Sequence, residues 1–185
     1  MITKKSFQTI LVLAICLAVA SAQLSTEVPN NIDCILEPKD GIGGLYLGNL
    51  GGARDFGLLR GLKIDSVLTV AAGTGLKYGT HHNVKHLIIH ADDHSEYDLA
   101  QYFDEGIEFI RENLKTGNVF VHCFVGMSRS VTMVLAYMVQ ELKMELRAAF
   151  NHVKEKRWIA GPNEGFMRQL AAFEKKLKLK SSTEF

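Results

Sequence analysis

The sequence has little net charge, few cysteines and no internal repeat or long low-complexity tract. Its 185 residues carry 21 Lys and Arg against 20 Asp and Glu, a formal net charge of +1. This balance gives no overall positive field, so we expect no binding to DNA or RNA. The length and the hydrophobic content of 47% predict an ordinary globular chain with one domain and a substantial core.

Three cysteines are too few for a disulfide-dense scaffold, and no two of them have the Cys-x-x-Cys spacing of a zinc site. Cys16 lies in an apolar segment near the N-terminus, which leaves Cys34 and Cys123 in the rest of the chain. A disulfide between these two is an alternative if the protein is secreted. Because the surroundings of Cys123 favour a reactive thiolate, we expect a free thiol there.

The apolar run near the N-terminus, at residues 10–20, is too short to cross a bilayer comfortably. Two lysines precede it and Ala20-Ser21-Ala22 follows it, which is the order of a secretory signal peptide. We therefore expect residues 1–22 to be removed, leaving a mature chain from Gln23 with no stable membrane span. The secretory pathway or the extracellular space is the expected location. A membrane-spanning helix, a buried N-terminal extension and a cytoplasmic location are the alternatives.

Residues 122–130, with the sequence HCFVGMSRS, are the most informative stretch of the chain. The apolar segment before them predicts a strand and the segment after them predicts a helix. A loop between such elements turns successive backbone N–H groups towards one point, which makes an anion site at the helix N-terminus. Arg129 supplies a planar fork for two phosphate oxygens, and the same positive field favours the thiolate of Cys123. The pattern predicts attack by sulfur on phosphorus.

Strands and helices alternate along the chain. Strands are predicted at 45–47, 66–70, 85–90 and 118–121, and helices at 51–61, 98–115, 131–140, 144–156 and 163–178. Asp98 and Gln101 have the spacing of a capping box. This order predicts an α/β fold with a mainly parallel central sheet flanked by helices, and it places Cys123 at the carboxyl end of a strand, where ligands bind. The expected divisions are a signal peptide at 1–22, an N-terminal extension at 23–34, one catalytic domain at 35–178 and a C-terminal tail at 179–185.

Expulsion of an oxygen leaving group from phosphorus is assisted by a carboxylic acid. Asp92 and Asp93 lie in a loop at 91–97 that also begins at the carboxyl end of a predicted strand. A solvated turn is the alternative for both residues, and their spacing alone does not choose between them. His122 is interpreted as a hydrogen-bonding residue beside Cys123. No metal is expected, because the remaining clustered histidines cross a strand and a loop and share no helical face: His81, His82, His86, His90 and His94.

Four segments resemble the dual-specificity phosphatases, the compact branch of the cysteine-dependent protein tyrosine phosphatases. These are VHCFVGMSRS, GLYLGN from Gly44, DSVLTVAAG from Asp65 and PNEGFMRQL from Pro162. The resemblance covers residues 35–177 and implies the fold of that superfamily. The chain departs from the family in its signal-like N-terminus and in Trp158, which stands where many members have proline.

The resemblance implies roles for individual residues. Cys123 is then the nucleophile, Arg129 the phosphate clamp, Asp93 the acid nine residues before Tyr102, and Ser130 the hydroxyl that eases departure of the thiolate. Asn163 corresponds to an asparagine that steadies the phosphate loop, although a helix N-cap explains it equally well. The residues of the loop that bind phosphate are Phe124, Val125, Gly126, Met127, Ser128 and Arg129.

The sequence therefore predicts a protein phosphatase that needs no metal or other cofactor and acts on phosphotyrosine and phosphoserine/phosphothreonine. Its partner is a phosphoprotein, with a protein kinase as one candidate. The apolar side chains of Phe124, Val125 and Met127 favour a phosphotyrosine ring over a lipid headgroup. The alternatives are a glucan or phosphoinositide phosphatase, and a phospho-binding module with little turnover. A sulfurtransferase is less favoured, because it has no role for Asp93 and Ser130.

Overall fold

The computed structural model describes residues 30–78 and 84–183. The expected signal peptide at 1–22 and most of the expected extension at 23–34 lie outside these residues. In chain order the elements are β1 (Ile32–Leu36), β2 (Leu45–Gly48), α2 (Leu50–Arg54), α3 (Phe56–Gly61), β3 (Ile64–Val70), β4 (Lys85–Ile89), the 3₁₀ turn η1 (Ala100–Tyr102), α4 (Phe103–Leu114), β5 (Asn118–His122), α5 (Arg129–Glu141), α6 (Leu146–Lys156) and α7 (Glu164–Thr183). No described helix is long and apolar enough to cross a membrane.

The strands form one sheet in the order β1-β2-β5-β3-β4. β2, β5, β3 and β4 pair in parallel, and β1 pairs antiparallel with β2 at one edge. The expected mainly parallel sheet is confirmed, with β5 near its centre. The edge strand β1 was not expected, and the division placed between residues 34 and 35 falls inside it.

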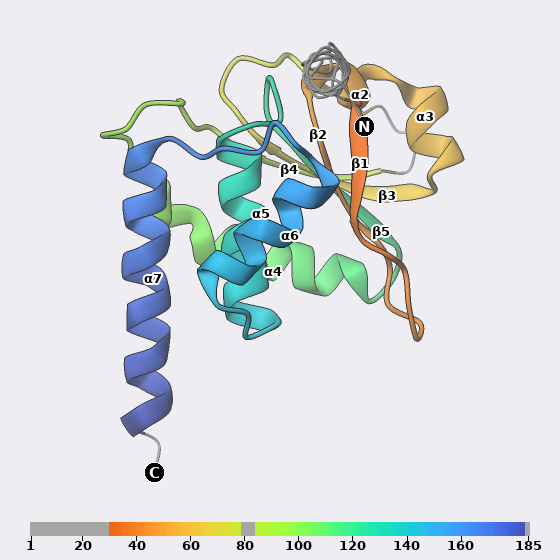
Figure 1. The fold of residues 1–185 in the computed structure, drawn as a ribbon. Coiled ribbons are helices and arrows are strands. Elements are labelled where there is room, and N and C mark those ends of the chain that lie inside the picture. Colours follow the sequence, from red (N-terminus) through yellow and green to blue (C-terminus); the bar gives the residue numbers. More distant parts are fainter. Residues whose placement is uncertain (1–29, 79–83, 184–185) are drawn as a thin grey trace, which may run out of the picture.

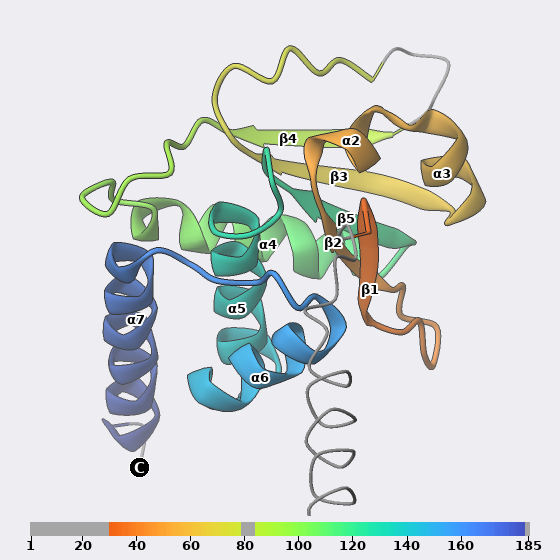
Figure 2. The ribbon, with the colours of Figure 1, turned by 45° about the horizontal axis from the view of Figure 1, so that its top comes forward.

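Helices cover both faces of the sheet, as the alternation predicts (Figures 1 and 2). α4, α5, α6 and α7 lie on one face, over a core that includes Val119 and Val121 of β5. The short helices α2 and α3 lie on the other face, where Phe120 belongs to a smaller cluster with Leu59 and Val67. Successive residues of β5 therefore enter opposite cores, which makes its three central residues apolar and fixes its register.

α5 is the most deeply placed helix. Residues 129–139 are all buried, and the helix contacts α4, α6 and α7. A helix that is apolar nearly all round is one that packs inside a domain. Because α5 follows directly from the loop at 123–128, its burial gives that loop a rigid support.

Two helix boundaries differ from expectation. Asp98 accepts a hydrogen bond from the backbone N–H of Gln101, at 3.3 Å, but the Gln101 side chain donates to the Asp98 carbonyl and forms no reciprocal capping box. The chain then makes one 3₁₀ turn before α4 begins at Phe103. The second boundary is the C-terminal end of α7. This helix continues to Thr183, so the tail expected from residue 179 is helical for most of its length.

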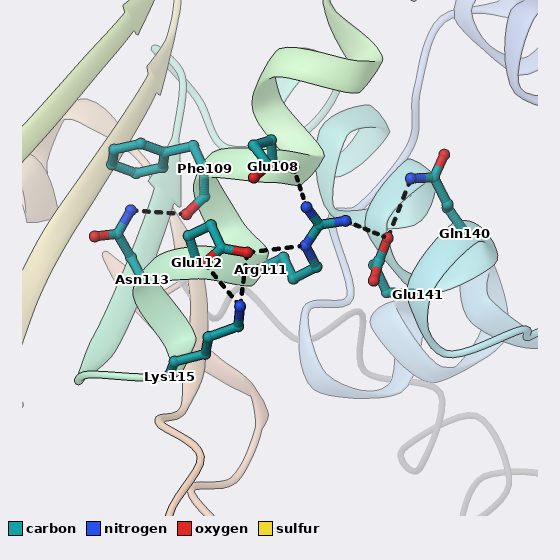
Figure 3. Close-up of polar contacts among 8 residues, drawn as sticks. All are labelled: Glu108, Phe109, Arg111, Glu112, Asn113, Lys115, Gln140 and Glu141. Carbon is teal, nitrogen blue, oxygen red and sulfur yellow. Dashed lines mark hydrogen bonds and ion pairs between the residues drawn. The ribbon is translucent and has the colours of Figure 1, made fainter.

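A surface network joins α4 and α5 at the end of α5 away from the loop (Figure 3). Arg111 of α4 pairs with Glu108 and Glu112 on its own helix and with Glu141 of α5, whose carboxylate lies 3.6 Å from the guanidinium. Lys115 also pairs with Glu112. The network lies between the C-terminal ends of the two helices.

Candidate active site

The loop between β5 and α5 wraps around the sulfur of Cys123. Cys123 is buried, and its Sγ accepts hydrogen bonds from the Gly126 N–H and the Ser130 hydroxyl, both at 3.2 Å. These two donors and the N-terminus of a 13-residue helix all place positive charge density near the sulfur. The arrangement suits a thiolate and a bound anion alike.

Glycine is required at position 126. Its φ is +74°, and a Cβ there would lie 2.3 Å from the Gly48 carbonyl oxygen. The carbonyls of the loop are held by neighbouring segments: the Leu50 N–H donates to Phe124 and the Gly161 N–H donates to Met127. With these carbonyls held outside, N–H groups of the loop can face the sulfur, as the Gly126 N–H does.

Arg129 lies buried at the edge of this loop. Its Nη1 donates to the Ala91 carbonyl at 3.0 Å, and its guanidinium carbon lies 5.5 Å from the centre of the Phe124 ring. Its Nε has no hydrogen-bond partner, and among the described residues it is the one buried side-chain nitrogen or oxygen of which this is true. An unpaired buried donor is costly, and a phosphate oxygen is a partner of the right charge for it.

Asp93 rather than Asp92 makes the contacts expected of the acid. Its Oδ1 accepts hydrogen bonds from the Ser128 hydroxyl at 2.7 Å and from Asn163 Nδ2 at 2.9 Å. Its Oδ2 lies 3.6 Å from Arg129 Nε. Both aspartates are exposed, and it is the contacts of Asp93 with Ser128 and Arg129 that bring it to the phosphate loop.

Asn163 lies between the start of α7, Asp93 and the phosphate loop. Its Oδ1 accepts from the Phe166 N–H at 2.9 Å and caps α7, while its Nδ2 holds Asp93. Its backbone N–H also donates to the Ser128 hydroxyl. Asn163 therefore joins the start of α7 to the acid loop (residues 91–97) through its side chain and to the phosphate loop through its backbone N–H.

Two further residues of the PNEGFMRQL segment hold the acid loop, and sequence reasoning missed both. Gln169 donates to the Tyr97 carbonyl and accepts from the Leu99 and Ala100 N–H groups, at 2.7 to 2.9 Å. A Cβ at Gly165 would lie 1.7 Å from the Ser95 carbonyl oxygen, so only glycine permits this close packing. The acid loop is therefore anchored to α7 on the far side of Asp93.

His122 lies beneath the loop, fully buried. Its Nδ1 lies 3.1 Å from the Cys123 carbonyl, and its Nε2 lies 2.7 Å from the Thr69 hydroxyl, which also contacts His86. Burial lowers the pKa of His122 to about 4, so the ring is neutral near pH 7. Since the carbonyl can only accept, Nδ1 carries the proton and Nε2 accepts from Thr69. The expected hydrogen-bonding role beside Cys123 agrees with this geometry.

Arg157 is a site residue to which the sequence analysis gave no role. Its side chain is fully buried and donates to the Gly126 carbonyl at 2.7 Å and to the Val125 carbonyl at 3.1 Å. It follows Lys156 at the end of α6, where a basic residue normally faces solvent, so no local pattern pointed to it.

The structure excludes a disulfide between Cys34 and Cys123, and both are free thiols. Cys34 aligns with Tyr46, and Tyr46 aligns with Phe120, three residues before Cys123. The Cα atoms of Cys34 and Cys123 are therefore two strand spacings apart across the sheet and three residues apart along a strand, a separation of about 14 Å. A disulfide requires less than about 7 Å.

Among the described residues, no three or more His, Cys, Asp or Glu side chains gather as a metal site. His86 contacts Thr69, and His94 accepts a hydrogen bond from the Glu96 N–H. His81 and His82 lie outside the described residues.

Comparison with known proteins gives consistent results. Residues 45–176 match the family model described as dual specificity phosphatase, catalytic domain. The chain is 40% identical over 137 residues to dual specificity protein phosphatase 1 of Arabidopsis thaliana, covering 74% of this chain and 68% of that protein. It is also 40% identical over 136 residues to dual specificity protein phosphatase 1B of the same plant, covering 73% and 80%. A crystal structure of DUSP15 superposes with a TM-score of 0.68 at 32% identity, covering 80% of this chain and 96% of that one.

Proposed function

This chain belongs to the dual specificity phosphatase family and is a protein phosphatase, and on that premise we propose that Cys123 carries phosphate between substrate and water. The convergence of Cys123, Arg129 and Asp93 on one loop carries the proposal. These residues come from two separate segments of the chain, and the Cys123 sulfur lies among hydrogen-bond donors suited to an anion.

In the first step the Cys123 thiolate attacks phosphorus. An S–P bond forms while the bond from phosphorus to the substrate oxygen breaks, and Asp93 gives that oxygen its proton. Arg129 holds two phosphate oxygens, and one of them accepts a hydrogen bond from the buried Nε, which has no such partner in the free enzyme. The loop N–H groups stabilise the negative charge that the phosphoryl group carries through the transition state.

In the second step water hydrolyses the cysteinyl phosphate. The Asp93 carboxylate removes a proton from the water, which attacks phosphorus as the S–P bond breaks. The sulfur leaves as a thiolate, and the hydrogen bond from the Ser130 hydroxyl, at 3.2 Å in the free enzyme, stabilises that charge. Inorganic phosphate is released, and Cys123 and Asp93 return to their starting protonation states.

The approach of substrate changes the partners of Arg129. In the free enzyme the Asp93 carboxylate lies 3.6 Å from Arg129 Nε. A phosphate dianion that binds Arg129 competes with this carboxylate for the guanidinium.

The surroundings of the loop favour a peptide carrying phosphotyrosine. Phe124, Val125, Met127 and Trp158 are exposed large hydrophobic side chains, and the first three belong to the loop itself. An aromatic phosphate ester can cover such a surface with its ring. We therefore rank phosphotyrosine in a protein, a protein kinase being one candidate, above a glucan or a phosphoinositide.

Hydrolysis of p-nitrophenyl phosphate in the presence of EDTA tests the proposal. The purified chain should turn over, and Cys123→Ser should be inactive while it still binds phosphopeptide. Turnover by the serine variant would contradict the covalent mechanism. A wild-type chain that binds phosphopeptide without turnover would favour the phospho-binding alternative. Parallel assays with phosphotyrosine and phosphothreonine peptides, a phosphoinositide and a phosphorylated glucan rank the substrate classes.

We also propose that the protein enters the secretory pathway. The support is the order of lysines, apolar run and Ala20-Ser21-Ala22 at the N-terminus. N-terminal sequencing of protein from its native cells should then find Gln23 or a neighbour as the first residue. Recovery of cytosolic protein that retains Met1 would contradict the proposal.

A further inference from the structure

Arg157 is a buried charge that the proposed mechanism does not use. Its guanidinium makes hydrogen bonds in two directions. On one side Nε and Nη2 donate to the Gly126 and Val125 carbonyls, and on the other side Nη1 donates to the Asn30 carbonyl at 2.8 Å and to Asp33 Oδ2 at 2.6 Å. The side chain is fully buried, and that of Asp33 is 11% exposed.

The bonds to Gly126 and Val125 bear directly on the phosphate site. For the loop N–H groups to face an anion, the carbonyls of the same peptide units must point the other way. Two carbonyls on the outside of the loop accept hydrogen bonds from Arg157. The Gly126 peptide is held especially closely, since a Cβ on Gly126 would lie 2.6 Å from Arg157 Nη2.

The bond to Asp33 explains how a charged fork can remain in this place. A buried guanidinium is stable only when it is paired and its donors are satisfied. Asp33 supplies the opposite charge from β1, and it is itself held by Asn30 Nδ2 at 2.9 Å. The edge strand thus completes an arrangement whose other end is the phosphate loop.

We propose that Arg157 is a positioning residue for the phosphate loop and that Asp33 of β1 holds Arg157 in position, which makes the N-terminal strand part of the active-site scaffold. Neither residue touches the reacting atoms. Both act by fixing the direction of the Val125 and Gly126 peptide units. The inference rests on the proposed function, because the phosphate site is where the effect is measured.

Three variants separate positioning from general stability. Arg157→Met keeps the bulk and removes all donors, Arg157→Lys keeps the charge without the fork, and Asp33→Asn keeps the shape without the charge. The matched control is His152→Ala, since His152 Nε2 joins α6 to the Ile35 carbonyl of the same strand at 2.8 Å without touching the phosphate loop. Each variant is assayed well below its unfolding temperature.

Misplacement of a binding group by about 1 Å costs up to about 10²-fold in rate. We expect Arg157→Met to lower kcat/KM for p-nitrophenyl phosphate by about 10- to 10²-fold. The inhibition constant for inorganic phosphate should rise in parallel. The loss should be the same for good and poor leaving groups, because the acid is untouched. Asp33→Asn and Arg157→Lys should fall between this variant and the wild type, and His152→Ala should lower only the unfolding temperature.

A double-variant cycle tests the link between the two residues. If Asp33 acts through Arg157, adding Asp33→Asn to Arg157→Met should cause no further kinetic loss. Additive losses would overturn the role of Asp33. Equal kinetic losses in His152→Ala and Asp33→Asn would overturn the positioning role, as would normal phosphate inhibition in Arg157→Met. If Arg157→Met does not fold, Asp33→Asn against His152→Ala decides alone.

Phosphate binding separates failure of this inference from failure of the proposed function. Titration of the Cys123→Ser chain with inorganic phosphate measures the loop without any turnover. If the wild type is inactive, the proposed function fails, yet the dissociation constants of the Asp33 and Arg157 variants in this background still support or overturn the positioning role.

Discussion

Asp93→Asn should slow this enzyme in a way that depends on the leaving group. Asparagine keeps an oxygen that can accept from Ser128 and Asn163, whose bonds to Asp93 measure 2.7 and 2.9 Å, so the loop should keep its place. The amide cannot donate the proton that an alkoxide or phenoxide leaving group needs. General acid catalysis contributes about 10²- to 10⁴-fold, so phosphotyrosine and phosphothreonine peptides should lose activity in that range.

The structure allows a separate estimate of how much the position of the carboxylate contributes to the rate. Ser128 and Asn163 each supply one hydrogen bond to the carboxylate, and a net bond of about 1 kcal/mol corresponds to roughly a fivefold change. Asn163→Ala should therefore cost about fivefold in kcat, far less than loss of the acid itself. A loss as large as that of Asp93→Asn would show that placement of the carboxylate dominates its chemistry.

The assay compares peptides with an aryl phosphate whose leaving group is already a stable anion. Asp93→Asn should affect the aryl phosphate much less, and the alkaline limb of its pH profile should disappear. Asp92→Asn is the matched control, with the same change of charge one residue earlier, and should be mild for every substrate. Leaving-group dependence in Asp92→Asn instead would refute the assignment of the acid, and its absence from both variants would place the acid outside this loop.

Three further predictions concern single residues. Arg129→Lys should lose nearly as much kcat/KM as Arg129→Ala, because an ammonium group lacks the planar fork; near-normal kinetics would show that charge suffices. Burial raises the pKa of Cys34 to about 11, so iodoacetamide near pH 7 should label Cys123 and spare Cys34 in peptide mass spectra. Inactivation that follows labelling of Cys34 would be contrary evidence. Burial lowers the pKa of His122 from an ordinary 6.5 to about 4. Between these pH values the unfolded chain binds a proton that the folded chain does not. The free energy of unfolding should therefore fall as the pH drops through this range. His122→Asn should flatten that fall in urea titrations, and an unchanged slope would assign the effect to other groups.

The phosphate loop could be predicted because its chemistry is local in the sequence. Cys123, Gly126 and Arg129 lie within one short stretch between an apolar strand and a helix, and the structure keeps that order. The choice of Asp93 over Asp92 could not be made from spacing. It depends on Ser128 and Asn163, which lie 35 and 70 residues away, and only the family resemblance indicated it in advance.

The elements that were missed or misjudged are those whose signals are weak within the chain. β1 has only one fully buried residue in five and depends on antiparallel pairing with β2. The helix predicted at 163–178 ends too early, because α7 continues to Thr183. The sequence Lys180-Ser181-Ser182-Thr183 contains neither glycine nor proline to stop a helix, and the helix continues through it.

The role of Arg157 could not be predicted from the sequence, because its partners lie far from it along the chain. Its neighbours in sequence predict solvent exposure, yet its partners come from β1, from Asn30, two residues before β1, and from the phosphate loop. A catalytic loop with outward carbonyls needs donors behind it, and short segments of sequence do not reveal where those donors come from. Substitution of Asp33 in β1 should therefore change phosphate binding, although Asp33 does not touch the substrate. The residues that shape the phosphate site thus extend through Arg157 to the edge strand of the sheet.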